Sequence, residues 1–334
     1  MIKYNSDVSI KEGVLTKVSF DKLTLTKSDD IDFVNSNLVD CVFDKCEFLD
    51  TEFNFASNRN LIISNSVFTS CDFTKAMFSE CTFANCMFVS CNFNSTKFNK
   101  ITATNTLFSQ CQFEKLISTD CIFKDSDFLD CMFNKVNIKS CNFNDCDFTK
   151  SNLKNSIFNC SEFKRIDFIG TVLDKNNFSF CSMTTLDFSK SEMLPENIFI
   201  STNLSKSDFS NIRTQKTIFF EVNLTGSSFS NFHSTGSQFE KANLSKVIMN
   251  NTNLSFSNFR NANFSEAQII SSNISMSNMS YCNFDGMTVS DSNLSYNNFH
   301  DINGEYIFKN NDLSYIRETD EGRKKAEEWY YEQK

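Results

Sequence analysis

The cysteines are the side chains of this sequence best suited to chemistry, because thiolates bind metals, form disulfides and act as nucleophiles. There are 14 of them, and most recur at steps of five residues or its multiples, as Cys91, Cys111 and Cys131 do. Zinc and redox sites use closely spaced pairs such as Cys-x-x-Cys, and none occurs here. We therefore expect reduced, buried, structural thiols. Cys160 falls outside the register of the others, so we expect it to face solvent.

Other catalytic signals are weak. The chain has two histidines, His233 and His300, and 7 glycines, with neither a Gly-x-Ser-x-Gly nor a His-Glu-x-x-His motif. These are the patterns that mark hydrolase nucleophiles, metalloprotease ligands and phosphate loops. We predict that the protein is not an enzyme and that it uses no cofactor and no metal.

Four aspartates form the most informative polar pattern, because they are twenty residues apart: Asp127, Asp147, Asp167 and Asp187. If the chain repeats in space every twenty residues, their carboxylates form one column. Such a column could imitate the phosphates of a nucleic acid. The alternative is that Asp is one of the two residue types that the repeat uses at this position.

These residues belong to a five-residue pattern. From Phe33 to Met193 an apolar residue stands at every fifth position except Asn58 and Ser118. The pattern shifts by one near Pro195 and continues from Phe199 to Phe299. On an α-helix a step of five rotates by about 140°, which leaves no single apolar face. A straight strand alternates its faces. The remaining arrangement is a chain that turns every few residues and stacks its coils, with each fifth side chain pointing inward.

The residue two positions before the apolar centre is mostly small, and the residue just before the centre is often Asp or Asn. Examples are Cys146-Asp147-Phe148-Thr149-Lys150 and Ala242-Asn243-Leu244-Ser245-Lys246. This resembles the pentapeptide-repeat family over about residues 33 to 313. The resemblance implies an all-β fold, a right-handed, four-sided parallel β-helix with four pentapeptides per coil and roughly 13 coils.

The pattern divides the chain into four parts. We expect cap strands and a first irregular coil in 1–32, the first frame of the β-helix in 33–194, the second frame in 195–313 and a helical cap in 314–334. The cap helix should run from about Thr319 to Gln333, with Ala326, Trp329 and Tyr330 on one side. In family members that bind DNA gyrase, a terminal segment of this kind mediates dimerisation, so capping and homodimer formation both stay open.

Polar residues replace the apolar centre at four positions: Asn58, Ser118, Thr214 and Ser234. We expect local bulges or outward loops there. Loops on a solenoid are frequent contact points, so these positions are also candidate binding sites.

Charge narrows the choice of partner. The formal net charge of -9 makes direct binding to nucleic acid or to an anionic membrane improbable. The sequence has no apolar run of about 18 residues, and Met1 to Asp7 do not resemble a signal peptide. We expect a cytoplasmic protein, or one exported as an effector by a dedicated secretion system.

Together these features predict a non-enzymatic protein that binds a protein partner along a rigid rod. The family resemblance implies DNA gyrase or topoisomerase IV as the partner, with the acidic column acting as a DNA-shaped decoy. The alternative is a bacterial effector or scaffold that binds a host or cellular protein.

Overall fold

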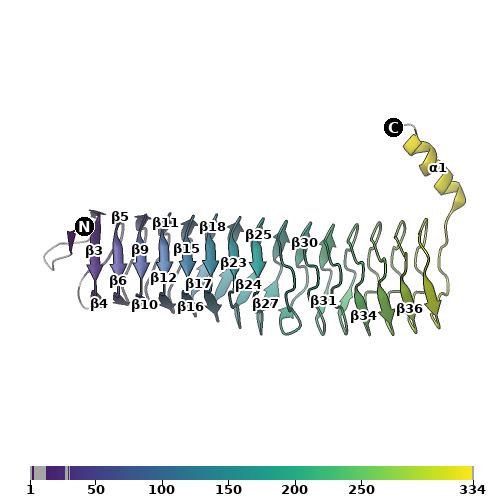
Figure 1. The fold of residues 1–334 in the computed structure, drawn as a ribbon, viewed down its shortest axis with the longest axis horizontal. Coiled ribbons are helices and arrows are strands. Elements are labelled where there is room, and N and C mark those ends of the chain that lie inside the picture. Colours follow the sequence, from purple (N-terminus) through teal and green to yellow (C-terminus); the bar gives the residue numbers. More distant parts are fainter. Residues whose placement is uncertain (1, 4–12, 27–28, 30, 333–334) are drawn as a thin grey trace. The chain divides into compact units, whose positions relative to one another are not determined.

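The computed structural model describes residues 2–3, 13–26, 29 and 31–332. The chain divides into two units, Met1–Asn177 and Phe178–Lys334. In each unit the chain coils so that short parallel strands stack on the strands of the coil before (Figure 1). The coils add up to about 15 turns, against the roughly 13 expected from the repeats alone. The expected four-sided parallel β-helix with a C-terminal helix is therefore confirmed.

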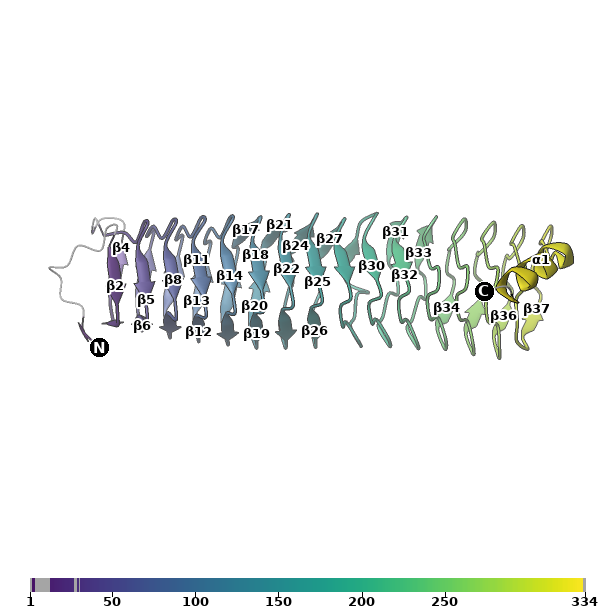
Figure 2. The same cartoon turned by 90° about the horizontal axis from the view of Figure 1, so that it is seen from above.

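The first unit has four sheets, one on each side of the coil (Figure 2). The nine-stranded sheet contains β1 (Ile2–Lys3), β3 (Val18–Asp21), β6 (Val42–Asp44), β9 (Ile62–Ser64), β12 (Thr82–Ala84), β15 (Thr102–Thr104), β19 (Ile122–Lys124), β23 (Asn142–Asn144) and β26 (Glu162–Lys164). The six-stranded sheet contains β4 (Thr24–Thr26), β7 (Glu47–Leu49), β10 (Val67–Thr69), β13 (Met87–Val89), β16 (Leu107–Ser109) and β20 (Asp127–Leu129).

The two other sides of this unit follow the same plan. One contains β2 (Val14–Thr16), β5 (Asn37–Val39), β8 (Ser57–Arg59), β11 (Met77–Ser79), β14 (Lys97–Asn99), β18 (Ile117–Thr119), β22 (Asn137–Lys139) and β25 (Ile157–Asn159). The last contains β17 (Gln112–Glu114), β21 (Met132–Asn134), β24 (Asn152–Lys154) and β27 (Val172–Asp174).

Register explains the apolar pattern. Phe68 lies opposite Phe88, and Phe88 opposite Phe108, so residues twenty apart stack. From Phe48 to Phe148 the stacked rings of one side have centroids 4.7 to 5.0 Å apart. The first coil differs, because Phe20 lies opposite Phe43. Part of the segment in which we expect an irregular first coil, including Val8 and Ile10, lies outside the described residues.

A left-handed residue makes each corner. Asn60, for example, has φ 52°, and its N–H donates to Ser79 O in the next coil at 3.0 Å. This conformation recurs at the second residue after the apolar centre, which is why the repeat has five residues. The small residue two positions before the centre points inward and makes a hydrogen bond to the preceding coil. Cys91 Sγ donates to Phe68 O at 3.3 Å, and Thr96 Oγ1 donates to Phe73 O at 2.8 Å.

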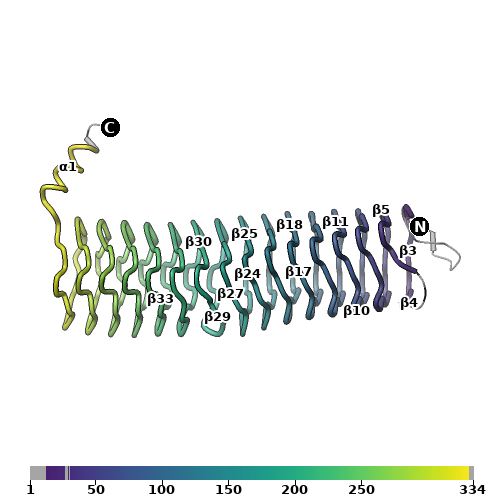
Figure 3. Tube along the Cα trace, turned by 180° about the vertical axis from the view of Figure 1, so that it is seen from behind, coloured from purple at the N-terminus to yellow at the C-terminus, as the bar shows by residue number. Residues whose placement is uncertain are grey.

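The second unit is built from stacked coils of the same kind (Figure 3). Its elements are β28 (Asn177–Ser179), which begins at the unit boundary, β29 (Glu192–Met193), β30 (Ile198–Ile200), β31 (Arg213–Gln215), β32 (Ile218–Phe220), β33 (His233–Thr235), β34 (Ile248–Asn250), β35 (Gln268–Ile270), β36 (Thr288–Ser290), β37 (Ile307–Lys309) and α1 (Glu321–Glu332).

The expected register shift near Pro195 and a second shift near Gly304 both lie in this unit. Asp187 pairs with Asp208, so one extra residue is accommodated in the coil that contains Pro195. Near the end, Asn283 pairs with Asn303, but Val289 pairs with Phe308, so the last coil is one residue short. Gly304 lies in this shortened turn, with φ 95°.

The prediction of bulges or outward loops at the polar centres is wrong. Asn58, Ser118, Thr214 and Ser234 lie in the regular strands β8, β18, β31 and β33, and all except the partly exposed Thr214 are buried. The physical reason is that turning one strand residue outward would turn its neighbours inward. The inward polar groups find bonds instead: Ser118 Oγ lies 3.3 Å from Cys141 Sγ, and Ser234 Oγ lies 2.6 Å from Ser237 Oγ.

The expected C-terminal helix is confirmed as α1. Ala326, Trp329 and Tyr330 are all exposed, and α1 contacts the coils through polar side chains that include Lys324 and Glu327. It lies beside the last coils instead of across their end (Figure 2). The apolar Ile302, Tyr306 and Phe308 line a hollow of about 520 Å³ at that end.

Candidate interaction surface

The cysteines are packed inside the coils with one exception. All are free thiols, and Cys160 alone among the 14 is exposed. Burial raises the pKa of Cys81 to about 11 and that of Cys282 to about 12, which keeps these thiols protonated and weakly nucleophilic. Within the described part of the chain, no three His, Cys, Asp or Glu side chains are placed to hold a metal ion.

The acidic column is partly assembled. Asp127 lies at the start of β20, and Asp147 follows it in the next coil, with its N–H donating to Asp127 Oδ1 at 3.2 Å. Asp147 pairs in turn with Asp167. Three of the four predicted residues therefore stack within the first unit. Asp187 belongs to the second unit, where it pairs with Asp208.

Most of these carboxylates also have a local structural role. Oδ1 of Asp147 accepts the N–H of Thr149 at 2.7 Å, and Asp167 and Asp187 make the same bond two residues on. Asparagines do the same throughout the second unit. For example, Asn243 Oδ1 accepts the N–H of Ser245 at 3.1 Å. This is the hydrogen bond of an Asx turn, so a corner of this kind selects Asp or Asn whatever the charge.

Asp127 is different. It lies in a regular strand, so its side chain makes no such turn, and it is partly buried. Burial raises the pKa of Asp127, and the neighbouring carboxylates of Asp147 and Asp125 raise it further. Asp125 lies 4.0 Å from Lys124 Nζ, whose side chain is 57% exposed. Negative charge is therefore concentrated, and only loosely compensated, around β20.

Sequence reasoning missed the surface that adjoins this cluster. The outward side chains of the six-stranded sheet are mainly apolar over five successive coils. We call this surface the apolar stripe, and it consists of Leu49, Val67, Met87, Val89, Leu107 and Leu129. The signal was present in the sequence as apolar residues next to the centres, repeated at twenty-residue spacing.

A shallow hollow joins the stripe to the acidic cluster. It has a volume of about 300 Å³, and its lining includes Met87, Leu107, Asp125 and Asp127. An apolar floor with two carboxylates at one end can accept an aliphatic chain that carries a positive charge.

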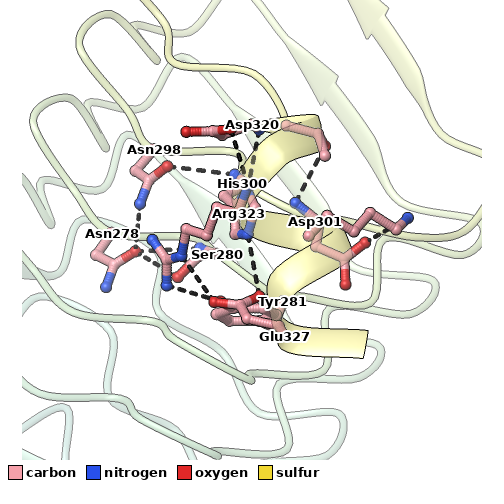
Figure 4. A network of polar contacts seen from close by, with 11 residues as sticks. Asn278, Ser280, Tyr281, Asn298, His300, Asp301, Asp320, Arg323 and Glu327 are labelled. Atoms are coloured by element: carbon pink, nitrogen blue, oxygen red, sulfur yellow. Dashed lines mark hydrogen bonds and ion pairs between the residues drawn. The ribbon is translucent and has the colours of Figure 1, made fainter. Parts of the chain in front are cut away.

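A second polar cluster fixes α1 against the last coils (Figure 4). Glu327 accepts a hydrogen bond from the Tyr281 hydroxyl at 2.6 Å and one from Arg323 Nε at 2.7 Å, and its other oxygen lies 3.3 Å from His300 Nε2. The N–H of Asp320 donates to His300 Nδ1 at 3.1 Å, so the proton of this ring is on Nε2. Bonds from Tyr281 and Arg323 lower the pKa of Glu327 to about 2. The groups of this cluster bond to one another and hold α1 against the last coils.

No helix of the described chain is long and apolar enough to cross a bilayer.

Comparison with known proteins agrees with this architecture. The pentapeptide-repeat family profile matches 8 copies, over residues 66–110, 108–149, 137–174, 217–255, 237–275 and 248–286, which is more than half of the chain. No curated protein sequence matches significantly.

Among solved structures, the chain is similar to HetL, a pentapeptide repeat protein involved in heterocyst differentiation regulation from the cyanobacterium Nostoc sp. strain PCC 7120. The identity is 15%, over 78% of this chain and 88% of that one, with a TM-score of 0.32. It is also similar to QnrB1, a plasmid-mediated fluoroquinolone resistance protein, at 14% identity over 95% and 99% of the two chains with a TM-score of 0.17. A pentapeptide repeat protein from the Arabidopsis thaliana thylakoid lumen is 25% identical over 30% of this chain and 66% of its own, with a TM-score of 0.16. On the family match and the repeating coil geometry, the chain belongs to the pentapeptide-repeat family.

Proposed function

We propose that this protein is a non-enzymatic scaffold that binds another protein through the side of its first unit that carries the six-stranded sheet. The observation that supports this most is the composition of that side, where the apolar stripe leads directly to stacked carboxylates at Asp127, Asp147 and Asp167. Surfaces of this kind on soluble proteins commonly mark contact sites.

For the partner we propose a type II topoisomerase, DNA gyrase or topoisomerase IV, with the acidic column occupying the channel that holds DNA. The column supplies one carboxylate for each coil, at a spacing of roughly 4.8 Å. One DNA strand carries a charge every 3.4 Å or so along the axis. A single column therefore has about 70% of the charge density of one strand, and Asp125 and Asp130 add to it beside Asp127.

The test is a fourfold change of Asp127, Asp147, Asp167 and Asp187 to Asn. Asn makes the turn bond of Asp147, Asp167 and Asp187 elsewhere in this chain, and at position 127 its side-chain oxygen can still accept the N–H of residue 147. The fold should therefore persist while four charges are lost. We expect loss of gyrase supercoiling inhibition and of its salt sensitivity. A control variant should remove four carboxylates from other sides of the coil: Asp21, Asp120, Glu162 and Glu192.

Unchanged inhibition by the fourfold variant, with the thermal midpoint retained, would exclude the DNA decoy. The same scaffold could then serve as a bacterial effector that binds another cellular or host protein, and affinity capture of intact gyrase subunits separates the two proposals.

We also propose that a second copy of the chain binds the exposed side of α1. Ala326, Trp329 and Tyr330 leave an apolar surface there, with Trp329 64% and Tyr330 51% exposed. Light scattering on wild type and on the double variant Trp329→Ala/Tyr330→Ala tests this. A dimer that survives the double change would contradict it.

A further inference from the structure

The apolar stripe has a regular geometry that limits what can bind it. Its strands β7, β10, β13, β16 and β20 are parallel and in register, so Met87 and Leu107 lie opposite each other on adjacent strands. Leu49 and Met87 are 45% and 42% exposed, which is high for side chains of this size. Within the stripe, Val67, Met87 and Leu107 align on three consecutive coils. Leu49 and Leu129 lie on the strands at its two ends, in the neighbouring column.

An added β-strand cannot occupy this surface. The backbone groups of the sheet are already bonded to the coils on either side, as in Met87 N–H to Ser66 O at 3.0 Å and Leu107 N–H to Cys86 O at 2.9 Å. β-Augmentation needs a free sheet edge. The occupant must therefore bind through side chains that lie on a flat apolar surface.

An α-helix fits these dimensions. Coils repeat at roughly 4.8 Å, while a helix rises by about 5.4 Å for each turn, so a helix lying along the stack meets about one coil with each turn. Four steps from β7 to β20 span roughly 19 Å, the length of a helix of about 13 residues. The apolar residues of an amphipathic helix, at positions i, i+3, i+4 and i+7, could each contact one coil.

Charge selects the polar part of that helix. The stripe ends at Asp125 and Asp127, and Asp147 lies one coil further on. Asp127 Oδ1 accepts a hydrogen bond from the backbone N–H of Asp147, which is an uncharged donor. This bond leaves the negative charge of the Asp127 carboxylate for a ligand. Lys or Arg near one end of the helix would complement this cluster. The same carboxylates disfavour the surface of an anionic membrane as the occupant.

We propose that the six-stranded sheet of the first unit is a docking site for a cationic amphipathic helix of a partner protein. The apolar side of that helix covers the stripe from Leu49 to Leu129, and its basic side chains reach Asp125 and Asp127. This inference rests on the proposed scaffold function and adds the chemical class of the partner segment. It does not require that the partner be a topoisomerase.

The chain offers a matched pair of residues for the test. Met87 lies in β13 of the stripe and Met77 lies in β11 on another side of the coil, with exposures of 42% and 45% and the same position in a three-residue strand. The probe is a fluorescent 14-residue peptide with Leu at i, i+3, i+4 and i+7 and Lys or Ala elsewhere, titrated by anisotropy. We expect Met87→Ser to weaken binding at least tenfold and Met77→Ser to change it less than twofold.

A second arm separates charge from apolar contact. Asp125→Asn/Asp127→Asn should weaken peptide binding at low salt and flatten its salt dependence, because it removes the carboxylates at the end of the stripe. A peptide with Glu in place of Lys should bind at least tenfold more weakly than the Lys peptide. Equal loss in the Met87 and Met77 variants, or no binding by the Lys peptide, would overturn the proposal.

Failure of this inference is distinguishable from failure of the decoy proposal. If the peptide binds the stripe and Met87→Ser leaves gyrase inhibition intact, the docking site stands independently of the acidic column. If Met87→Ser fails to fold by circular dichroism, Leu107→Ser with the same peptide provides the second measurement, since Leu107 lies opposite Met87 on β16.

Discussion

Replacing Gly304 with Ala tests the shortened last coil directly. Asn303 O accepts the N–H of Phe284 at 2.8 Å and Glu305 O accepts that of Gly286 at 2.6 Å, so Gly304 is drawn against the coil below. A Cβ at Gly304 would lie 2.3 Å from the backbone nitrogen of Asp285 and 2.6 Å from its Cα. Backbone atoms cannot rotate away as a side chain can, so the coil itself must move.

A matched glycine separates this overlap from the cost of backbone conformation. Gly226 also has a positive φ, 69°, but a Cβ there would meet only the flexible Lys206 side chain, at 3.7 Å. Gly226→Ala should therefore cost about 1 to 2 kcal/mol of unfolding free energy through the left-handed conformation alone. Gly304→Ala should cost a further 1 to 3 kcal/mol or so, because the overlap acts like overpacking.

The effect should be local, because each coil contacts only its neighbours. His300 and Asp301, which precede Gly304, hold α1 through Glu327 and Lys324. We expect hydrogen exchange to accelerate in residues 299–318 and in α1, with little change in the coils around 219–240. Equal destabilisation by Gly304→Ala and Gly226→Ala, or unchanged exchange in α1, would refute this account of the register shift.

Three further predictions concern single side chains. Asn58→Leu should raise the unfolding free energy by about 1 to 2 kcal/mol, because buried Asn58 Oδ1 has no hydrogen-bond partner. The urea midpoint should rise accordingly, and a lower midpoint would contradict this. Iodoacetamide should label one thiol in the native protein, and Cys160→Ser should abolish that labelling, whereas fast labelling of Cys131 would disprove the burial of the stack. Glu327 has a folded pKa of about 2, below its ordinary 4.5, so its contribution to α1 docking is complete above about pH 4.5 and is lost as pH falls towards 2. The fluorescence anisotropy of Trp329, the one tryptophan, should fall over that range in wild type and lack this transition in Glu327→Gln.

The fold was largely predictable because one period determines both packing and turning. An apolar residue at every fifth position can be buried only if the chain turns at every repeat, and the structure has Phe68, Phe88 and Phe108 stacked accordingly. The inward thiols follow from the same register, as does the exposure of Cys160. These features depend on local spacing, which the sequence contains in full.

The polar centres and the helix were harder to predict, because they depend on contacts between coils. Whether Asn58 bulges outward or stays buried is decided by its neighbours Leu38 and Phe78, which hold the strand in register. The side of α1 that packs is decided by which corner it meets after the shortened turn, where Tyr281 and Asp301 happen to offer polar groups. Apolar Trp329 gave no indication of this.

Function in such a chain is best sought where the repeat does not explain the residue. Asp147 and Asp167 complete Asx turns that Asn completes equally well elsewhere, so geometry accounts for their oxygen but not for their charge. Asp127 makes no such turn and has a raised pKa from burial beside other carboxylates, which is a cost to the folded chain. The exposed apolar Met87, two coils away on the same sheet, also lowers solubility without stabilising the core. Two residues that the coil does not require, one charged and one apolar, line the same hollow, and this is the reason that we assign binding to this sheet ahead of the other sides.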